Sequence, residues 1–198
     1  MTKTVLSEWP LVRGDYKIGN PKSRISVVTL ASSIESYNQA SMWGTCKTEN
    51  LGIEKIVLNA ISNSNVRYIL ICGIESRGHL SGKTLLAFHK HGIDLTGRIK
   101  KSDGAIPFIE NLPHNAIERF QKQITLINRI GLTDIKEIQQ IVDEYKNKGD
   151  AYNEEPLIIG VKEKKKNLSE LSISGDIIIS NEYMIDSKIG IICEISDA

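Results

Sequence analysis

One histidine lies in a setting typical of ligand sites, within the segment Cys72–Gly82. The apolar run Tyr68–Ile71 before it predicts a buried strand, and helical spacing of apolar residues resumes at Leu85. His79 is therefore expected in a strand-to-helix turn, where α/β proteins build ligand sites, and nearby glycines let the backbone approach a large ligand. A neutral imidazole there can coordinate a metal or move a proton. A turn without any ligand is the alternative interpretation of the same spacing.

Length and charge narrow the class of protein. The chain has 198 residues, which suits one α/β domain with a modest appendage. Lysine and arginine number 25 against 24 acids, so there is no large positive field and we expect no nucleic-acid partner. No apolar run approaches the ~20 residues of a spanning helix, so we expect no direct membrane insertion. The three cysteines lie far apart and no secretory segment is present, which predicts a cytoplasmic protein.

Strands and helices alternate through the first 150 residues. Apolar runs rich in β-branched residues predict strands at 25–30, 68–72 and 124–130. Helical spacing predicts helices at 34–42, 53–61, 82–91, 114–122 and 134–148. This alternation predicts a Rossmann-like α/β fold, with a mostly parallel sheet flanked by helices.

The pattern changes after Gly149. Short apolar runs predict strands at 157–161, 176–179 and 189–193, with few helical signals between them. We expect residues 151–198 to form a small β-rich appendage packed on the main domain of residues 1–150, because open apolar strands would aggregate. The basic run at 162–166 contains a glutamate and predicts a solvated face.

Common catalytic and nucleotide-binding motifs do not fit. The first strand is followed by Ala31-Ser32-Ser33, where a dinucleotide fingerprint would need glycines, and Arg77 replaces the first glycine of a phosphate loop. A nucleotide-binding enzyme is therefore disfavoured, and no Gly-x-Ser-x-Gly elbow supports a hydrolase. His89 and His91 fall two apart on a predicted helix and point in different directions, so they are not a metal pair.

Six blocks of sequence share their order with one known family over residues 9–150. They are Trp9–Tyr16, Val27–Leu30, Cys46–Lys55, Cys72–Gly73 with Gly78–His79, Gly104–Pro113 and Glu118–Phe120. In these blocks the chain resembles the corrinoid-binding A subunit of tetrahydromethanopterin S-methyltransferase.

The resemblance implies a cobalamin-type corrinoid whose cobalt carries a methyl group and takes His79 as its lower axial ligand. It implies partner methyltransferase proteins, because in the family the methyl group comes from methyl-tetrahydromethanopterin and passes to coenzyme M. The family's membrane-bound form ends in a hydrophobic anchor, whereas this chain ends in strand-like runs. We therefore expect a methyl carrier without sodium pumping. Arg77 stands at the aspartate position of the common Asp-x-His-x-x-Gly signature, so the binding mode of ordinary cobalamin methyltransferases is not transferred.

The corrinoid is expected at the carboxyl ends of the strands, where crevices open in such sheets. We predict contacts from three loops, and no catalytic residue: Ala31, Ser32, Gly73, Ile74, Glu75, Gly78, His79, Leu80, Ser81, Gly82, Gly104, Ala105, Ile106, Pro107, Phe108 and Asn111. Core packing of Phe108 or Ile109 is the alternative interpretation of the third loop. Glu54 or Glu49 should accept a hydrogen bond from the second ring nitrogen of His79. Two rival functions stay open: a module that stores or senses corrinoid, and a scaffold that has lost the cofactor.

Overall fold

The computed structural model describes residues 1–160, 177–178, 183–185 and 192–194. The chain divides into two compact units, Met1–Ile159 and Gly160–Ala198. This division falls after residue 159, beyond the predicted boundary at residue 150, because the segment before it is fixed to the first unit. Leu157 donates its backbone N–H to the carbonyl of Ile61 at 2.9 Å, and Ile159 packs on the main core.

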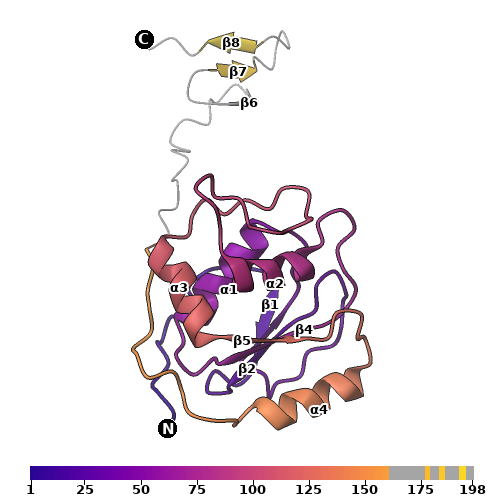
Figure 1. Cartoon of the computed structure of the whole chain (residues 1–198), viewed down its shortest axis with the longest axis vertical. Helices are drawn as coiled ribbons and strands as arrows, with labels where there is room; N and C mark the ends of the chain where they lie inside the picture. Colours follow the sequence, from indigo (N-terminus) through magenta and orange to yellow (C-terminus); the bar gives the residue numbers. More distant parts are fainter. Residues whose placement is uncertain (161–176, 179–182, 186–191, 195–198) are drawn as a thin grey trace. The chain divides into compact units, whose positions relative to one another are not determined.

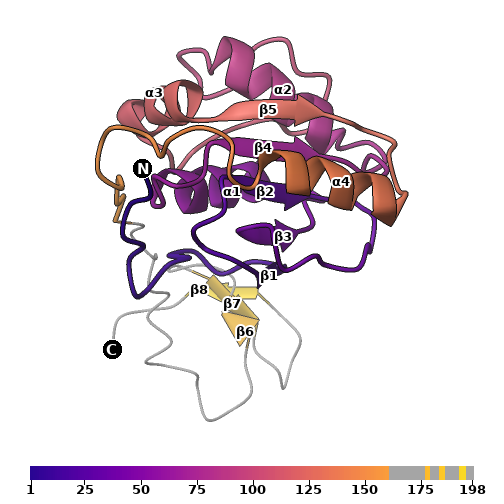
Figure 2. The same cartoon turned by 90° about the horizontal axis from the view of Figure 1, so that it is seen from below.

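The first unit is built on a five-stranded sheet with the order β1-β3-β2-β4-β5, visible in Figure 2. Its strands are β1 (Tyr16–Ile18), β2 (Ile25–Val28), β3 (Met42–Gly44), β4 (Tyr68–Ile71) and β5 (Thr125–Asn128). Strand β1 is antiparallel to β3, and the other neighbours are parallel. In the register, Val28 pairs with both Gly44 and Ile71, and Ile71 pairs with Asn128. The carboxyl ends of four parallel strands are therefore level.

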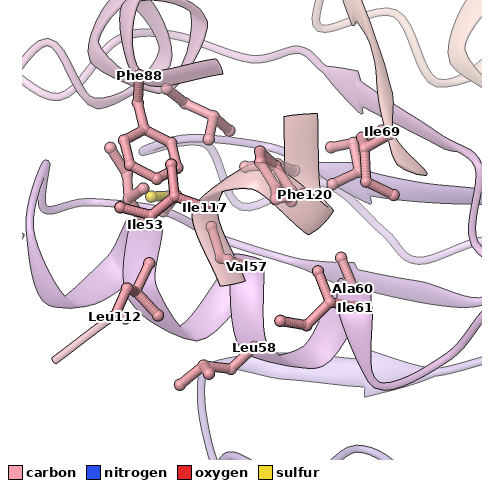
Figure 3. Packing of buried hydrophobic residues seen from close by; sticks show 14 of the residues in the cluster. Ile53, Val57, Leu58, Ala60, Ile61, Ile69, Phe88, Leu112, Ile117 and Phe120 are labelled. Atoms are coloured by element: carbon pink, nitrogen blue, oxygen red, sulfur yellow. The ribbon is translucent and has the colours of Figure 1, made fainter. Parts of the chain in front are cut away.

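Helices cover both faces of this sheet. Helices α1 (Leu51–Ile61), α2 (Ser81–His91) and α3 (His114–Gln123) lie on one face, and α4 (Ile135–Tyr145) lies on the other (Figure 1). Because successive strand residues point to opposite faces, Ile69 packs under the three helices while Leu70 packs against α4. Figure 3 shows Phe88 and Phe120 reaching from α2 and α3 into the space above α1. The predicted α/β fold with a mostly parallel sheet is confirmed.

The sequence misplaced the elements at one edge of the sheet. The predicted helix at 34–42 is wrong: residues 34–41 form loop and turn, and β3 follows. Ile34, Tyr37 and Ala40 imitate helical spacing, yet they pack as a loop against the core on the α4 face. Trp43 fixes this loop by donating its indole N–H to the carbonyl of Ile34 at 3.2 Å. Strand β1 was not predicted.

The second unit contains a small antiparallel sheet with the order β6-β7-β8. These strands are β6 (Ile177–Ile178), β7 (Tyr183–Ile185) and β8 (Ile192–Glu194). Strand β6 falls in the predicted run 176–179, β8 overlaps the end of the predicted run 189–193 and extends one residue beyond it, and β7 was not predicted. The predicted strand at 157–161 is wrong over residues 157–160, which have no strand partner. Its last residue and the basic run at 162–166 lie outside the described residues.

Candidate functional site

Three loops meet at the level carboxyl ends of the parallel strands. The loop after β2 accepts a backbone hydrogen bond from Cys46, whose N–H reaches the carbonyl of Leu30 at 3.0 Å. The loop from β3 to α1 is tied to the start of α2, where the Ser81 hydroxyl donates to the carbonyl of Cys46 at 2.5 Å. The β3–α1 loop therefore lies between the ends of β2 and β4, where the sequence predicted a ligand site.

His79 and Glu49 form a hydrogen-bonded pair at this edge. The distance from Nδ1 of His79 to Oε2 of Glu49 is 2.7 Å. The Glu49 side chain is only 1 % exposed, whereas that of His79 is 44 % exposed. The other carboxylate oxygen of Glu49 accepts the backbone N–H of Ile106 at 2.6 Å. One buried carboxylate thus holds both the imidazole and the loop that contains Ile106.

The ionisation of Glu49 decides which nitrogen of His79 carries a proton. Burial alone would raise the pKa of Glu49, but hydrogen bonds from the backbone N–H groups of Ile106 and Glu49 itself and from His79 outweigh it, so the pKa is lowered. An ionised carboxylate only accepts hydrogen bonds, so Nδ1 of His79 is the donor. In the neutral ring the lone pair is then on Nε2. Among the described residues, Nε2 has no hydrogen-bond partner.

The turn that carries His79 is fixed from within. Glu75 accepts the backbone N–H of Gly82 at 3.0 Å and that of Lys83 at 2.7 Å, and so caps the start of α2. Leu80, directly after the histidine, adopts a left-handed conformation with φ of 46°. Gly78 also has a positive φ, 76°, and a Cβ there would meet nothing within 4 Å. The backbone before His79 therefore faces open space.

Glu54, the other predicted partner of His79, has a different role. Its carboxylate accepts the backbone N–H groups of Glu110 at 2.7 Å and Asn111 at 2.9 Å, and the side-chain amide of Asn111 at 2.8 Å. The side chain is buried. Glu49 and Glu54 together hold the segment 104–113 at two points, and the described contacts bring only Glu49 to His79.

Glu54→Ala is expected to lower the free energy of unfolding by about 3 kcal/mol, because three donors lose a charged acceptor. Urea unfolding followed by circular dichroism measures this change, and amide exchange at residues 110 and 111 should accelerate most. Glu144→Ala is the control, because it removes an exposed carboxylate paired with Lys148. It should lower the free energy of unfolding by about 0.5 kcal/mol or less. Equal stability of the two variants would show that other contacts hold the loop.

The predicted contact residues converge, but not all of them are accessible. Ser32 accepts the backbone N–H of Ile74 at 2.8 Å, and Ala31 donates its N–H to the carbonyl of Ile74 at 3.0 Å. Ile74 and Ile106 are 56 % and 57 % exposed, so two of the loops that meet at this edge present apolar side chains to the surface. The buried members of the predicted set are Gly73, Ser81, Gly82, Gly104 and Pro107. The exposed members are Ala31, Ile74, Gly78, Ala105, Ile106 and Asn111, and the remainder are half-buried.

The buried glycines permit close packing of the protein itself. A Cβ on Gly73 would collide with the carbonyl of Thr29, and its φ is 79°. A Cβ on Gly104 would lie 2.8 Å from the carbonyl of His79 and 3.0 Å from Cγ of Glu49. Gly104 therefore lets its loop close onto the histidine and its carboxylate. Phe108 lies under the guanidinium of Arg98, 5.5 Å from ring centre to Cζ.

A cavity of about 380 Å³ lies next to this edge and contains none of the predicted contact residues. It lies between α1 and strands β1, β3 and β2, and sequence reasoning missed it. A second hollow of about 320 Å³ includes Ser32 and lies along β3 and the loop after β2. The sequence signal that could have indicated the first cavity is the pair Trp9 and Tyr16. These two large side chains lie in a polar opening segment, and both line the cavity.

Cys46 and Cys72 are both buried, and burial raises the pKa of each thiol to about 12. Thiolates are the reactive form, so iodoacetamide at pH 8 should leave both unmodified in the folded protein. In urea both should react, and peptide mass mapping separates them from Cys193. If either cysteine reacted with iodoacetamide as fast in the folded protein as it does in urea, the result would contradict this burial.

The donor set at this edge is one imidazole with one carboxylate behind it. In residues 1–160 and the three short strands beyond, no group of three or more histidine, cysteine, aspartate or glutamate side chains converges to hold a bare ion. His79 offers one nitrogen, in the tautomer set by Glu49, directly after Gly78, where a Cβ would meet nothing within 4 Å. A single imidazole with a carboxylate behind it is the usual arrangement of a ligating histidine.

The fold and this edge define an α/β protein whose candidate site is a histidine–carboxylate pair at the carboxyl ends of a parallel sheet. Residues 2–169 match the family described as the A subunit of tetrahydromethanopterin S-methyltransferase, and the chain belongs to this family. The resemblance inferred from the six blocks is confirmed.

Named relatives agree with this assignment. The A subunit of a protein named "Putative methyltransferase Mtx" in Methanosarcina barkeri is 56 % identical over 195 residues, covering 98 % of this chain and 99 % of the relative. The tetrahydromethanopterin S-methyltransferase A subunit of Methanosphaera stadtmanae is 41 % identical, and the match covers 98 % of this chain and 79 % of the relative. In Methanothermobacter thermautotrophicus, the A subunit numbered 2 of this enzyme is 44 % identical, and the match covers 85 % of this chain and 94 % of the relative.

No helix in the described part of the chain is long and apolar enough to cross a membrane.

Proposed function

We propose that this chain is a corrinoid-binding methyl carrier that works with partner methyltransferase proteins. His79 would be the lower axial ligand of cobalt in a cobalamin-type corrinoid, and Glu49 would support it. The observation that carries the proposal is the pair itself: a buried, ionised carboxylate fixes Nδ1 of His79 and leaves the lone pair of Nε2 for a metal. When bound, the corrinoid supplies the cobalt centre that takes up and passes on the methyl group.

The chain's own groups have distinct tasks in this proposal. Glu49 keeps the ring in one tautomer and raises the basicity of Nε2, because it accepts a hydrogen bond from Nδ1–H. Glu75 and Gly78 set the turn, so that the imidazole is held at the edge of the sheet. Ile74 and Ile106 present apolar surface to a large ring and limit the access of water to it.

Family membership supports the need for partners. The three relatives described above are named as A subunits, and the names of two of them include tetrahydromethanopterin S-methyltransferase. Partners that deliver and remove methyl groups are therefore part of the proposal. They must reach the open side of the His79 turn, because the opposite side is filled by Glu49 and Gly104.

Incubation of the purified apoprotein with hydroxocobalamin, followed by desalting, tests the proposal. About one corrinoid per chain should elute with the protein, as the single candidate ligand requires. A protein fraction without corrinoid absorbance would overturn the carrier and also a storage or sensing role, and would leave a scaffold. Protein loaded with methylcobalamin is then mixed with a corrinoid:thiol methyltransferase and its thiol. Demethylation supports a carrier, and its absence supports storage or sensing.

A further inference from the structure

A turn at residues 94–97 carries the most exposed large apolar side chain in the described part of the chain. Leu95 is fully exposed, at 106 %. The carboxylate of Asp94 accepts the N–H and the hydroxyl of Thr96 at 2.8 and 2.7 Å and the N–H of Arg98 at 3.1 Å. The carbonyl of Asp94 accepts the N–H of Gly97, whose φ is 85°. Leu95 is therefore held outward by a hydrogen-bonded turn.

Three lysines gather at the base of this turn, beside the end of α2. Lys90 lies in the last turn of α2 with His91. Lys100, which Lys101 follows, donates its backbone N–H to the carbonyl of Gly92 at 3.1 Å. Burial lowers the pKa of His91, and the charges of all three lysines lower it further, so they stand near one imidazole. All three are exposed, and among the described residues none of them forms an ion pair.

This stretch is positive although the whole chain is nearly neutral. Residues 90–103 contain four lysine or arginine side chains, at 90, 98, 100 and 101, against the acids Asp94 and Asp103. The carboxylate of Asp94 is already engaged within the turn. A single exposed leucine needs no explanation by itself. An exposed leucine on a fixed turn with unpaired cations beside it is complementary to an acidic protein surface that has a small apolar pocket.

The turn and the surroundings of His79 belong to one continuous layer. Residues 97 and 99 hydrogen-bond through their backbones to residues 109 and 107, at 2.9 and 2.8 Å. Next to this pairing, the N–H of Ile106 reaches Glu49, which holds His79. Helix α2, labelled in Figure 1, runs from the histidine turn to the lysines and is about 15 Å long. A standard interface of ~800 Å² per partner is roughly 30 Å across, so one partner can cover both places.

We propose that the turn at 94–97 and the lysines beside it are the docking surface for an acidic methyltransferase partner, with Leu95 as its apolar anchor. This inference rests on the proposed function and adds the chemistry of the partner, which has carboxylates around a small apolar pocket. Opposite charges steer the encounter and fix the orientation of the two proteins. An anionic membrane would attract the same lysines, but one leucine offers little apolar area to lipid, whereas it fills a pocket of fixed shape.

Methyl transfer from the full chain, loaded with methylcobalamin, to a thiol tests the inference. The corrinoid:thiol methyltransferase of the earlier test is the probe, and its KM for the loaded chain reports docking. Leu95→Ser should raise this KM about tenfold, while kcat changes less than about twofold, because the anchor acts in association and not in the reaction. Lys100→Glu combined with Lys101→Glu should also raise KM about tenfold, and kcat/KM should then depend less on salt.

Direct binding separates docking from turnover. Isothermal titration calorimetry of the methyltransferase into the loaded chain should show affinity losses that match the rises in KM. Hydroxocobalamin binding and circular dichroism should be unchanged in both variants, because all three side chains are exposed. The controls are Ile158→Ser and the pair Lys22→Glu and Lys136→Glu, at exposed positions outside the layer. The control pair changes the net charge as much as the lysine variant does, and it should keep the wild-type KM.

The possible outcomes are distinct. Equal KM and affinity in wild type and the Leu95 and lysine variants would overturn the inference and leave the proposed function standing. A loaded chain that the methyltransferase neither binds nor demethylates would overturn the inference as well. Failure to bind corrinoid would overturn the proposed function at the desalting step, before any docking is measured. Sedimentation with phosphatidylglycerol vesicles that is lost in Leu95→Ser, together with an unchanged KM, would assign this surface to a membrane instead.

Discussion

His79→Ala should keep its fold and some corrinoid but lose the nitrogen coupling from histidine in the electron paramagnetic resonance spectrum of the Co(II) state. The side chain is 44 % exposed, so its removal creates no cavity in the core. Glu49 keeps its hydrogen bond from Ile106, which limits the cost to roughly 1–2 kcal/mol. Corrinoid affinity should fall because only contacts with the ring and its substituents remain.

Isotopically labelled histidine makes this measurement specific. His114→Ala is the matched control, because His114 is 82 % exposed and pairs only with Glu118 among the described residues. It should retain the full coupling of the wild-type protein. A labelled wild-type protein that binds corrinoid but shows no histidine coupling would refute axial ligation in that state.

Glu49→Gln should weaken corrinoid binding about 10–100-fold, the usual effect of losing the partner behind a metal ligand. Two donors, the Ile106 N–H and Nδ1–H of His79, point at this side chain, and an amide has only one oxygen. If the amide nitrogen faces His79, Nδ1 must accept and the proton moves to Nε2. The nitrogen that would bind cobalt then has no free lone pair.

Glu54→Gln is the matched control for this effect. It changes a buried carboxylate, five residues further along the chain, that holds the same segment but does not contact His79. Both variants should be less stable than wild type in urea, while only Glu49→Gln should lose most of its histidine coupling. Equal losses in the two variants would mean that the segment, and not the tautomer, controls ligation.

The central part of the fold could be predicted because its signals are local. The strands at 25–30, 68–72 and 124–130 are compact apolar runs, and β2, β4 and β5 form within them. Helices α2 and α4, which follow two of these runs, show regular apolar spacing. The edge strands β1 and β3 have three residues each, and β1 is largely exposed, so pairing and not composition creates them.

The site could be predicted only as far as its backbone. The turn with His79 follows from the strand before it and the glycines around it. The sequence does not decide between Glu49 and Glu54, which lie close together in the chain and hold the same segment. The cavity of about 380 Å³ beside α1 was missed because its walls come from separate stretches of chain that meet only when the strands pair and α1 packs on them.

Under the proposed function, the hydrogen bonds of Glu49 also set the stage of folding at which the domain can bind corrinoid. The two hydrogen bonds of Glu49 join it to residues that are 30 and 57 positions away in the sequence. The backbone hydrogen bonds that Glu54 accepts span 56 and 57 positions. Closing such long loops costs conformational entropy before the contact is gained, so we expect these bonds to form after the local contacts within the helices. A nascent chain that has emerged only as far as α2 contains His79 but lacks the residues that complete the surroundings of Glu49. Corrinoid would therefore be captured by finished domains, and a half-synthesised chain would leave it in solution.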